Sequence, residues 1–161
     1  MSILLKVLLT LTLVLSGLIT GLFYAYSCSV NPGLGRLADK DYIRAMQSIN
    51  RAILNPVFMV SFLGTLVMLP LSCWVWYSDH GPTGEFYLLL AAAVIYAFGV
   101  GVTGLGNVPL NESLDKFSLD TASPEEIRAR RKGFELPWNR FHLIRTLSCL
   151  AALILVLWAV I

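Results

Sequence analysis

The sequence predicts an all-α membrane protein in which a bundle of four helices crosses the bilayer. Of its 161 residues, 57% are hydrophobic and only 14% are charged, whereas charged residues make up about 25% of an average soluble domain. The mean hydropathy is +0.71, and the chain contains four long stretches without a charged side chain. This composition excludes a disordered chain. A net charge of +2 is too small to predict a nucleic-acid-binding face.

The uncharged stretches locate the four spans. A helix needs about 20 apolar residues to cross the hydrocarbon core, and the first three stretches reach that length. The fourth reaches it only if its helix begins near Phe141, which brings His142 and Arg145 into the end of the span. We therefore predict one transmembrane domain over residues 1–161. Its spans lie at about 4–27, 53–77, 86–106 and 140–160.

The first long loop follows span one. Residues 31–35 (NPGLG) have the composition of a turn, because proline fixes φ and glycine permits left-handed values. Residues 39–50 then place apolar side chains at helical spacing, which predicts a short amphipathic helix along the membrane interface that runs into span two.

The third loop repeats this plan. Residues 107–111 (NVPLN) predict a turn that ends span three, and residues 123–126 (SPEE) form a capping box that begins a charged helix at 124–132. Gly133 is expected to close that helix. An Asn-Arg pair then enters the next span in both halves, at 50–51 and 139–140. We predict two parallel span-loop-span repeats with short loop helices.

The basic residues set the predicted orientation. Ten Lys and Arg residues lie in the two long loops, and only Lys6 lies on the opposite side. Because cytoplasmic loops carry the excess of Lys and Arg, we expect both long loops in the cytoplasm and both termini outside. The predicted location is the inner or plasma membrane of the cell.

His142 and Arg145 are the ionisable pair that this arrangement brings into a span. Their i, i+3 spacing places them on one helix face, together with Trp138 and Cys149. Sixteen residues follow Arg145, about 24 Å of helix against a hydrocarbon core of about 30 Å. Arg145 therefore needs polar partners inside the bundle, or its side chain extends outward to lipid headgroups while His142 packs at the interface.

Asparagines occur at the same depth, at the loop ends of the spans: Asn50, Asn55, Asn107, Asn111 and Asn139. Each amide could simply bond a neighbouring carbonyl between helices. Together they predict a polar pocket under apolar helices, into which His142 and Arg145 point toward a ligand. The predicted ligand-binding residues are Asn50, Asn107, Asn111, Trp138 and Asn139.

The sequence predicts no metal site and no cofactor. The three cysteines form no CxxC pair, and no acidic residue lies within a predicted span. His142 is the one histidine in the spans, which is too few for a bis-histidine haem site. No nucleotide-binding or serine-nucleophile motif is present.

Three segments resemble the anthrone oxygenase-like family of small four-helix membrane proteins. They are NVPLN at 107–111 followed by Leu114, WNRFHLIRT at 138–146, and AMQSINRAILNP at 45–56. The bacterial members are largely domains of unknown function, whereas fungal relatives oxidise anthrones to anthraquinones with O2. The resemblance extends over nearly the whole chain.

The resemblance implies an oxygenase mechanism without a cofactor. Neutral His142 would remove the acidic C–H proton of an anthrone-like substrate, and the resulting anion would reduce O2. Arg145 and the asparagine amides would stabilise the developing oxyanion. Trp138, Phe141 or Tyr24 would stack on the flat substrate.

Two other functions remain open from the sequence. The same polar pocket would suit a binding protein or carrier for a small hydrophobic or anionic molecule, with Arg145 pairing an acid group. A structural membrane subunit would satisfy every polar group internally. The expected partners are the lipid bilayer and a small hydrophobic or aromatic ligand. The sequence does not decide whether the chain forms a homo-oligomer.

Overall fold

Four helices long and apolar enough to cross a membrane form the structure, a computed structural model that describes all residues 1–161 and contains no strand. The elements are α1 (Ile3–Ala25), η1 (Tyr26–Val30), α2 (Asn31–Leu34), α3 (Asp39–Ala52), α4 (Pro56–His80), α5 (Gly84–Val102), η2 (Thr103–Asn107), α6 (Val108–Asp115) and α7 (Pro124–Val160). The predicted all-α four-helix architecture is therefore confirmed.

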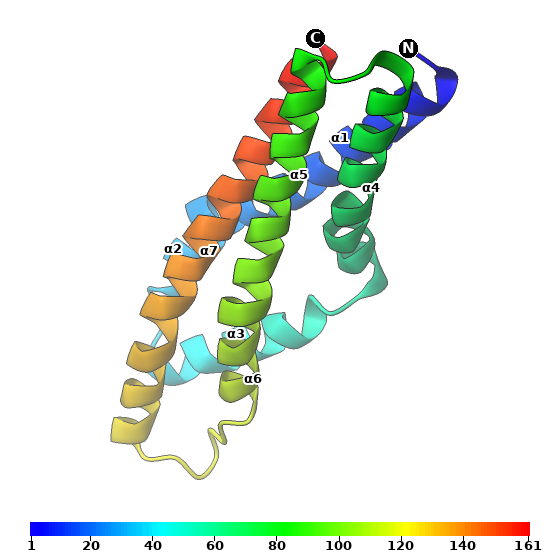
Figure 1. The fold of residues 1–161 in the computed structure, drawn as a ribbon. Helices are drawn as coiled ribbons and strands as arrows, with labels where there is room; N and C mark the ends of the chain where they lie inside the picture. Colours follow the sequence, from blue (N-terminus) through cyan, green and yellow to red (C-terminus); the bar gives the residue numbers. More distant parts are fainter.

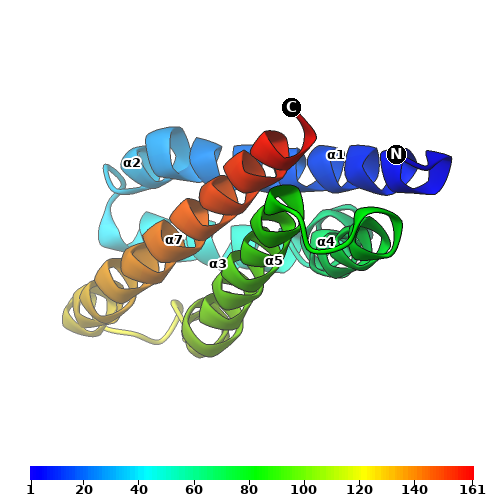
Figure 2. The ribbon, with the colours of Figure 1, turned by 45° about the horizontal axis from the view of Figure 1, so that its top comes forward.

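The two ends of the bundle differ in what they carry. Both termini and the α4–α5 hairpin lie at one end, and α3, α6 and the turn into α7 lie at the other, which we call the loop end (Figure 1). The long helices form a ring in which α1 contacts α4, α4 contacts α5, α5 contacts α7 and α7 contacts α1. Figure 2 shows α7 lying between α1 and α5.

Polar caps begin three of the helices. The Ser2 side chain accepts a hydrogen bond from the Leu5 amide, and Asn55 does the same for Phe58 at the start of α4. The predicted capping box at Ser123 and Glu126 is confirmed, with both reciprocal bonds present. These caps pair amides that have no partner within their own helix.

The turn predicted at 107–111 does not end the third helix, which continues to Asp115, and the first helix continues past Pro32 and ends at Leu34, late in the turn predicted at 31–35. Each helix passes through a π turn, closed by a bond from the Asn31 amide to the Tyr26 carbonyl in η1 and from Val108 to Thr103 in η2. In a regular α-helix a proline ring clashes with the carbonyl group of the residue four positions earlier. For Pro32 and Pro109 that carbonyl lies inside the π turn, where the wider backbone relieves the clash.

The other predicted break, at Gly133, is also absent. Residues 124–160 form one continuous helix, so the charged loop helix and span four are a single element. Gly81, in the α4–α5 hairpin, is the only residue with positive φ, so Gly133 lacks the left-handed conformation of a helix-closing glycine. In the first half, residues 53–55 do separate α3 from α4. The two halves share the π turn and differ in this break.

Two apolar cores are stacked along the bundle. The larger lies among α1, α4, α5 and α7, and the smaller lies at the loop end, where α3 packs on α6 and α7. The predicted amphipathic face of α3 is real, but Tyr42, Ile43 and Met46 are buried against protein rather than turned to the membrane interface. Burial and the nearby Glu135 carboxylate raise the pKa of the Tyr42 phenol above its usual value, so it stays protonated. The polar residues of the site lie between the two cores.

Candidate functional site: a buried histidine–arginine pair

His142 and Arg145 lie inside the bundle, on the face of α7 that turns toward α1 and α5. Their side chains are only 2% and 8% exposed. On the same helix, Trp138 belongs to the smaller core and Cys149 to the larger one. The pair therefore forms a polar layer between two apolar regions, and lipid headgroups do not surround it.

Both ring nitrogens of His142 are engaged. Nδ1 lies 3.2 Å from Nε and 3.1 Å from Nη2 of Arg145. Because a guanidinium can only donate, Nδ1 accepts, and the neutral ring carries its proton on Nε2. Nε2 lies 3.0 Å from Oγ of Ser27 and 3.4 Å from Oγ1 of Thr146. Each hydroxyl donates to a backbone carbonyl, so each oxygen is free to accept from Nε2.

Arg145 has no acidic partner. None of the five ion pairs in the structure includes it. Its guanidinium carbon lies 4.3 Å from the centre of the Phe23 ring and 5.2 Å from that of Trp138. Cation–π contact offsets part of the cost of burying the charge, but no carboxylate neutralises it. The site therefore holds a positive charge that an anion would complete.

Trp138 connects His142 to two of the predicted asparagines. Its ring stacks on the imidazole, with centroids 5.1 Å apart and an interplanar angle of 9°. The indole Nε1 donates to Oδ1 of Asn111 at 2.7 Å, and the Trp138 carbonyl accepts from Nδ2 of Asn107 at 3.2 Å. Asn107 is fully buried, and its Oδ1 has no partner. The bond to Asn111 orients the indole ring, on which the histidine ring stacks.

Three of the predicted site asparagines line two different cavities, and Asn107 lines neither. Asn50 and Asn111 line a cavity of about 220 Å³ between α3 and α6. Nδ2 of Asn50 is buried there without a partner. Asn139 instead shares a groove with His142. The structure thus brings together His142, Arg145 and Trp138 and places Asn50 in a different cavity from His142.

The groove beside His142, which we call the His142 groove, has a volume of about 420 Å³. It lies where η1 and α2 pass α7, and its walls are Ser27, Asn31, Pro32, Gly35, Glu135, Asn139, His142 and Leu143. A volume of this size is within the range of small-molecule sites, about 300–1,000 Å³. Its polar wall offers two amides, one hydroxyl, one imidazole and one carboxylate.

Three first-half residues of this site were not predicted from the sequence: Phe23, Tyr26 and Ser27. Tyr26 packs on both Trp138 and His142, with ring centroids 6.4 and 5.9 Å apart. Tyr24, one of the three stacking residues that the resemblance suggested, is 65% exposed and turns away from the site. The position of Ser27 at the loop end of span one could have indicated that it lies near the site. The direction of its side chain could not be predicted from α-helical spacing, because the π turn η1 changes that spacing.

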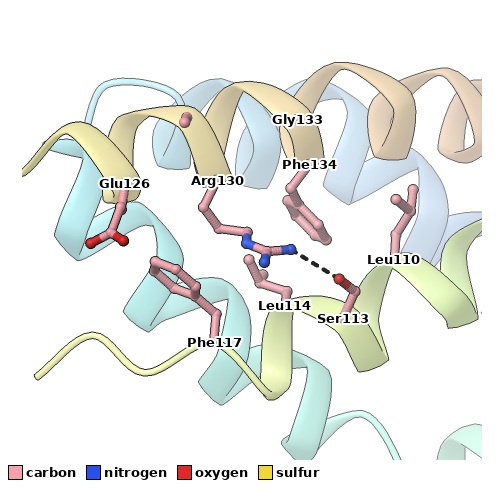
Figure 3. A pocket seen from close by; sticks show the side chains of 9 residues that line it. Leu110, Ser113, Leu114, Phe117, Glu126, Arg130, Gly133 and Phe134 are labelled. Atoms are coloured by element: carbon pink, nitrogen blue, oxygen red, sulfur yellow. Dashed lines mark hydrogen bonds between the residues drawn. The ribbon is translucent and has the colours of Figure 1, made fainter. Parts of the chain in front are cut away.

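A separate concavity of about 500 Å³ lies between α6 and the start of α7 (Figure 3). Arg130 crosses it, with its guanidinium carbon 5.0 Å from the centre of the Phe117 ring and Nη1 donating to Ser113 at 2.9 Å. None of the predicted site residues lines this concavity. No three His, Cys, Asp or Glu side chains gather anywhere as a metal-binding cluster.

Comparison with protein families gives a match to the family described as anthrone oxygenase, over residues 58–155. This chain belongs to the anthrone oxygenase family. The matched region, about three fifths of the chain, contains Glu135, Trp138, His142 and Arg145 and leaves out Ser27. Comparison with curated proteins and with solved structures gives no match. For this member of the anthrone oxygenase family, the chemistry must therefore be argued from the site.

Proposed function

We propose that this member of the anthrone oxygenase family is a cofactor-independent oxygenase that uses O2 to oxidise a flat, hydroxylated aromatic substrate in the His142 groove. The observation that carries the proposal is Arg145, a buried cation without a counter-ion, held directly behind His142. Proton removal next to an oxo group is accelerated by preorganised hydrogen-bond donors or positive charge where the oxyanion develops. This site holds such a charge before any substrate binds.

The substrate would lie along the His142 groove. The Nε2–H edge of His142, with Ser27 beside it, would donate to the substrate's oxo oxygen, and Arg145 would polarise the ring through Nδ1. Asn31 and Asn139 would bind ring hydroxyls. Since Nδ1 is occupied and Nε2 carries the proton, this geometry favours a hydrogen-bond donor over the base suggested by the sequence.

The reaction would proceed through the substrate anion. Loss of a C–H proton gives an anion whose charge rests largely on the oxo oxygen. The anion reduces O2, a C–O bond forms, and the resulting hydroperoxide loses water to leave a second carbonyl. A CH2 group becomes C=O and one O2 becomes one product oxygen plus water, so the four-electron oxidation and reduction balance.

Membrane placement is part of this proposal. Four apolar helices would hold the protein in the bilayer, and the basic loop end would face the cytoplasm. A flat aromatic substrate would partition into the bilayer. It would reach the His142 groove along the flank of α7, where Leu143 is 54% exposed.

The test is O2 uptake by the purified protein in lipid nanodiscs with dithranol, a dihydroxyanthrone, as substrate. We expect quinone formation well above the rate in empty nanodiscs, with one O2 consumed for each quinone formed. A rate equal to that of empty nanodiscs would contradict the proposal. Saturable dithranol binding without turnover would instead support a carrier for organic anions, which the unpaired Arg145 would also suit.

A further inference from the structure

We propose that Glu135 is the general base of the His142 groove, an assignment that rests on the proposed oxygenase function. His142 has no free lone pair, because Nδ1 accepts from Arg145 and Nε2 bears the ring proton. Proton removal therefore needs another group that reaches the same groove. Glu135 is the one acidic residue among the eight that line it.

One oxygen of Glu135 is held in place. Oε2 accepts from Nε of Arg131 at 2.8 Å. Arg131 also donates to the carbonyls of Leu37 and Gly35 and forms a 3.0 Å ion pair with Asp39. These bonds tie α7 to the segment between α2 and α3, so the carboxylate has a fixed position.

The other oxygen of Glu135 is available. Oε1 makes no hydrogen bond and lies beside Gly35, where an added Cβ would be 3.6 Å from it. Gly35 itself lines the His142 groove. A base needs a lone pair within hydrogen-bond reach of the proton that it removes, and Oε1 is the carboxylate atom that meets this condition.

The spacing along α7 matches the proposed substrate class. Glu135, Asn139 and His142 lie at i, i+4 and i+7, so they share one helix face. Seven residues separate the base and the donor by about 10 Å along the axis. The oxo oxygen and the opposite CH2 carbon of a central six-membered ring are about 4 Å apart, and a contact of about 3 Å at each end makes up the same span. A carboxylate base facing oxyanion donors is an established arrangement for removing a proton activated by a carbonyl group.

Glu135 can carry out every proton transfer in the reaction. It takes the first C–H proton and returns it to the peroxide anion that forms when the substrate anion reacts with O2. It then takes the second C–H proton as the O–O bond breaks. Protonation of the departing hydroxide by Glu135 gives water and leaves the carboxylate ready for another turnover.

The experiment measures two rates for each protein in nanodiscs: O2 uptake with dithranol, and anaerobic exchange of its CH2 hydrogens in heavy water. Exchange requires proton removal but no O2. For Glu135→Gln we expect both rates above background to fall by about 100-fold or more. Glutamine keeps an oxygen that can accept from Arg131, so the fold is retained. Glu135→Asp should keep measurable exchange, because a carboxylate remains.

The matched control is Asp39→Asn, which removes the other carboxylate on Arg131 and does not touch the groove. We expect exchange within about twofold of the unmodified protein. Exchange at the normal rate in Glu135→Gln, or an equal loss in Asp39→Asn, would overturn the assignment of Glu135 alone. Neither exchange nor O2 uptake by the unmodified protein would overturn the proposed function as well.

Discussion

The two π turns have the same backbone conformation, but one is partly exposed and the other is partly buried. η1 and η2 each precede a proline at the same distance, and each continues its helix past an Asn-Pro or Asn-Val-Pro segment. No residue of η1 is buried, and this turn forms one wall of the His142 groove. In η2, Thr103, Gly106 and Asn107 are buried against α7. A repeated local sequence thus builds an open wall in one half and a closed contact in the other.

The difference comes from what α7 presents to each turn. Toward η1 it presents His142, whose Nε2 meets Ser27. Toward η2 it presents Phe141, whose ring fills the space over Gly106, and the backbone at Trp138 that Asn107 binds. Function therefore depends on the helix that passes both turns, and the following substitutions test this contrast.

The largest expected effect is on the open side, at His142. His142→Phe keeps an aromatic ring on Trp138 but removes the Nε2–H donor, so we expect kcat for dithranol to fall by about 100-fold or more. His142→Gln keeps an N–H donor and should lose only about tenfold. Steady-state O2 uptake measures both. Equal losses in the two variants would show that the ring acts as a base rather than a donor.

On the closed side, Gly106→Ala should destabilise the protein by about 1–3 kcal/mol through overpacking. A Cβ at this position would lie 2.6 Å from the Phe141 ring, which is packed against it. Gly104→Ala, in the same π turn, meets nothing within 4 Å and is the matched control. Thermal unfolding in detergent compares them. If Gly106→Ala unfolds at the same temperature as the unmodified protein, η2 is not tightly packed against α7.

The smallest effect is expected at Ser27. Ser27→Ala removes the hydroxyl beside Nε2 and should lower kcat by about tenfold or less, with little change in unfolding, since one neutral hydrogen bond contributes about 1 kcal/mol. Ser29→Ala, in an exposed part of the same turn, should leave kcat unchanged. If both serine variants behave alike, η1 does not take part in the site.

The sequence predicted the four spans because uncharged length is a strong physical constraint in a bilayer. It also predicted the capping box, whose bonds are local, and the buried face of α3, which helical period reveals. The helix end predicted at Pro109 was wrong, and the first helix continues two residues past Pro32, because a proline indicates a break unless the backbone widens. The chain offers no local pattern that distinguishes these two outcomes.

For the site, the length of span four predicted that His142 and Arg145 lie within the end of the span, and the structure buries both side chains. The grouping of the asparagines could not be predicted as closely, because it depends on which face of α7 meets each neighbouring helix. Asn50 lines the cavity between α3 and α6 and not the His142 groove. Glu135 lay between the loop helix predicted at 124–132 and the start of span four, and only the continuity of α7 brings it into line with His142.

The most direct test of the account is Arg145→Gln against Arg140→Gln, an exposed arginine on the same helix. On the proposed mechanism, Arg145 stabilises the oxyanion at a cost in protein stability, because a buried cation without a counter-ion is unfavourable. Arg145→Gln should therefore lower kcat by about 100-fold or more while the thermal midpoint stays the same or rises. Arg140→Gln should change neither. Full activity in Arg145→Gln would contradict the central claim. A marked fall in its thermal midpoint would contradict it as well.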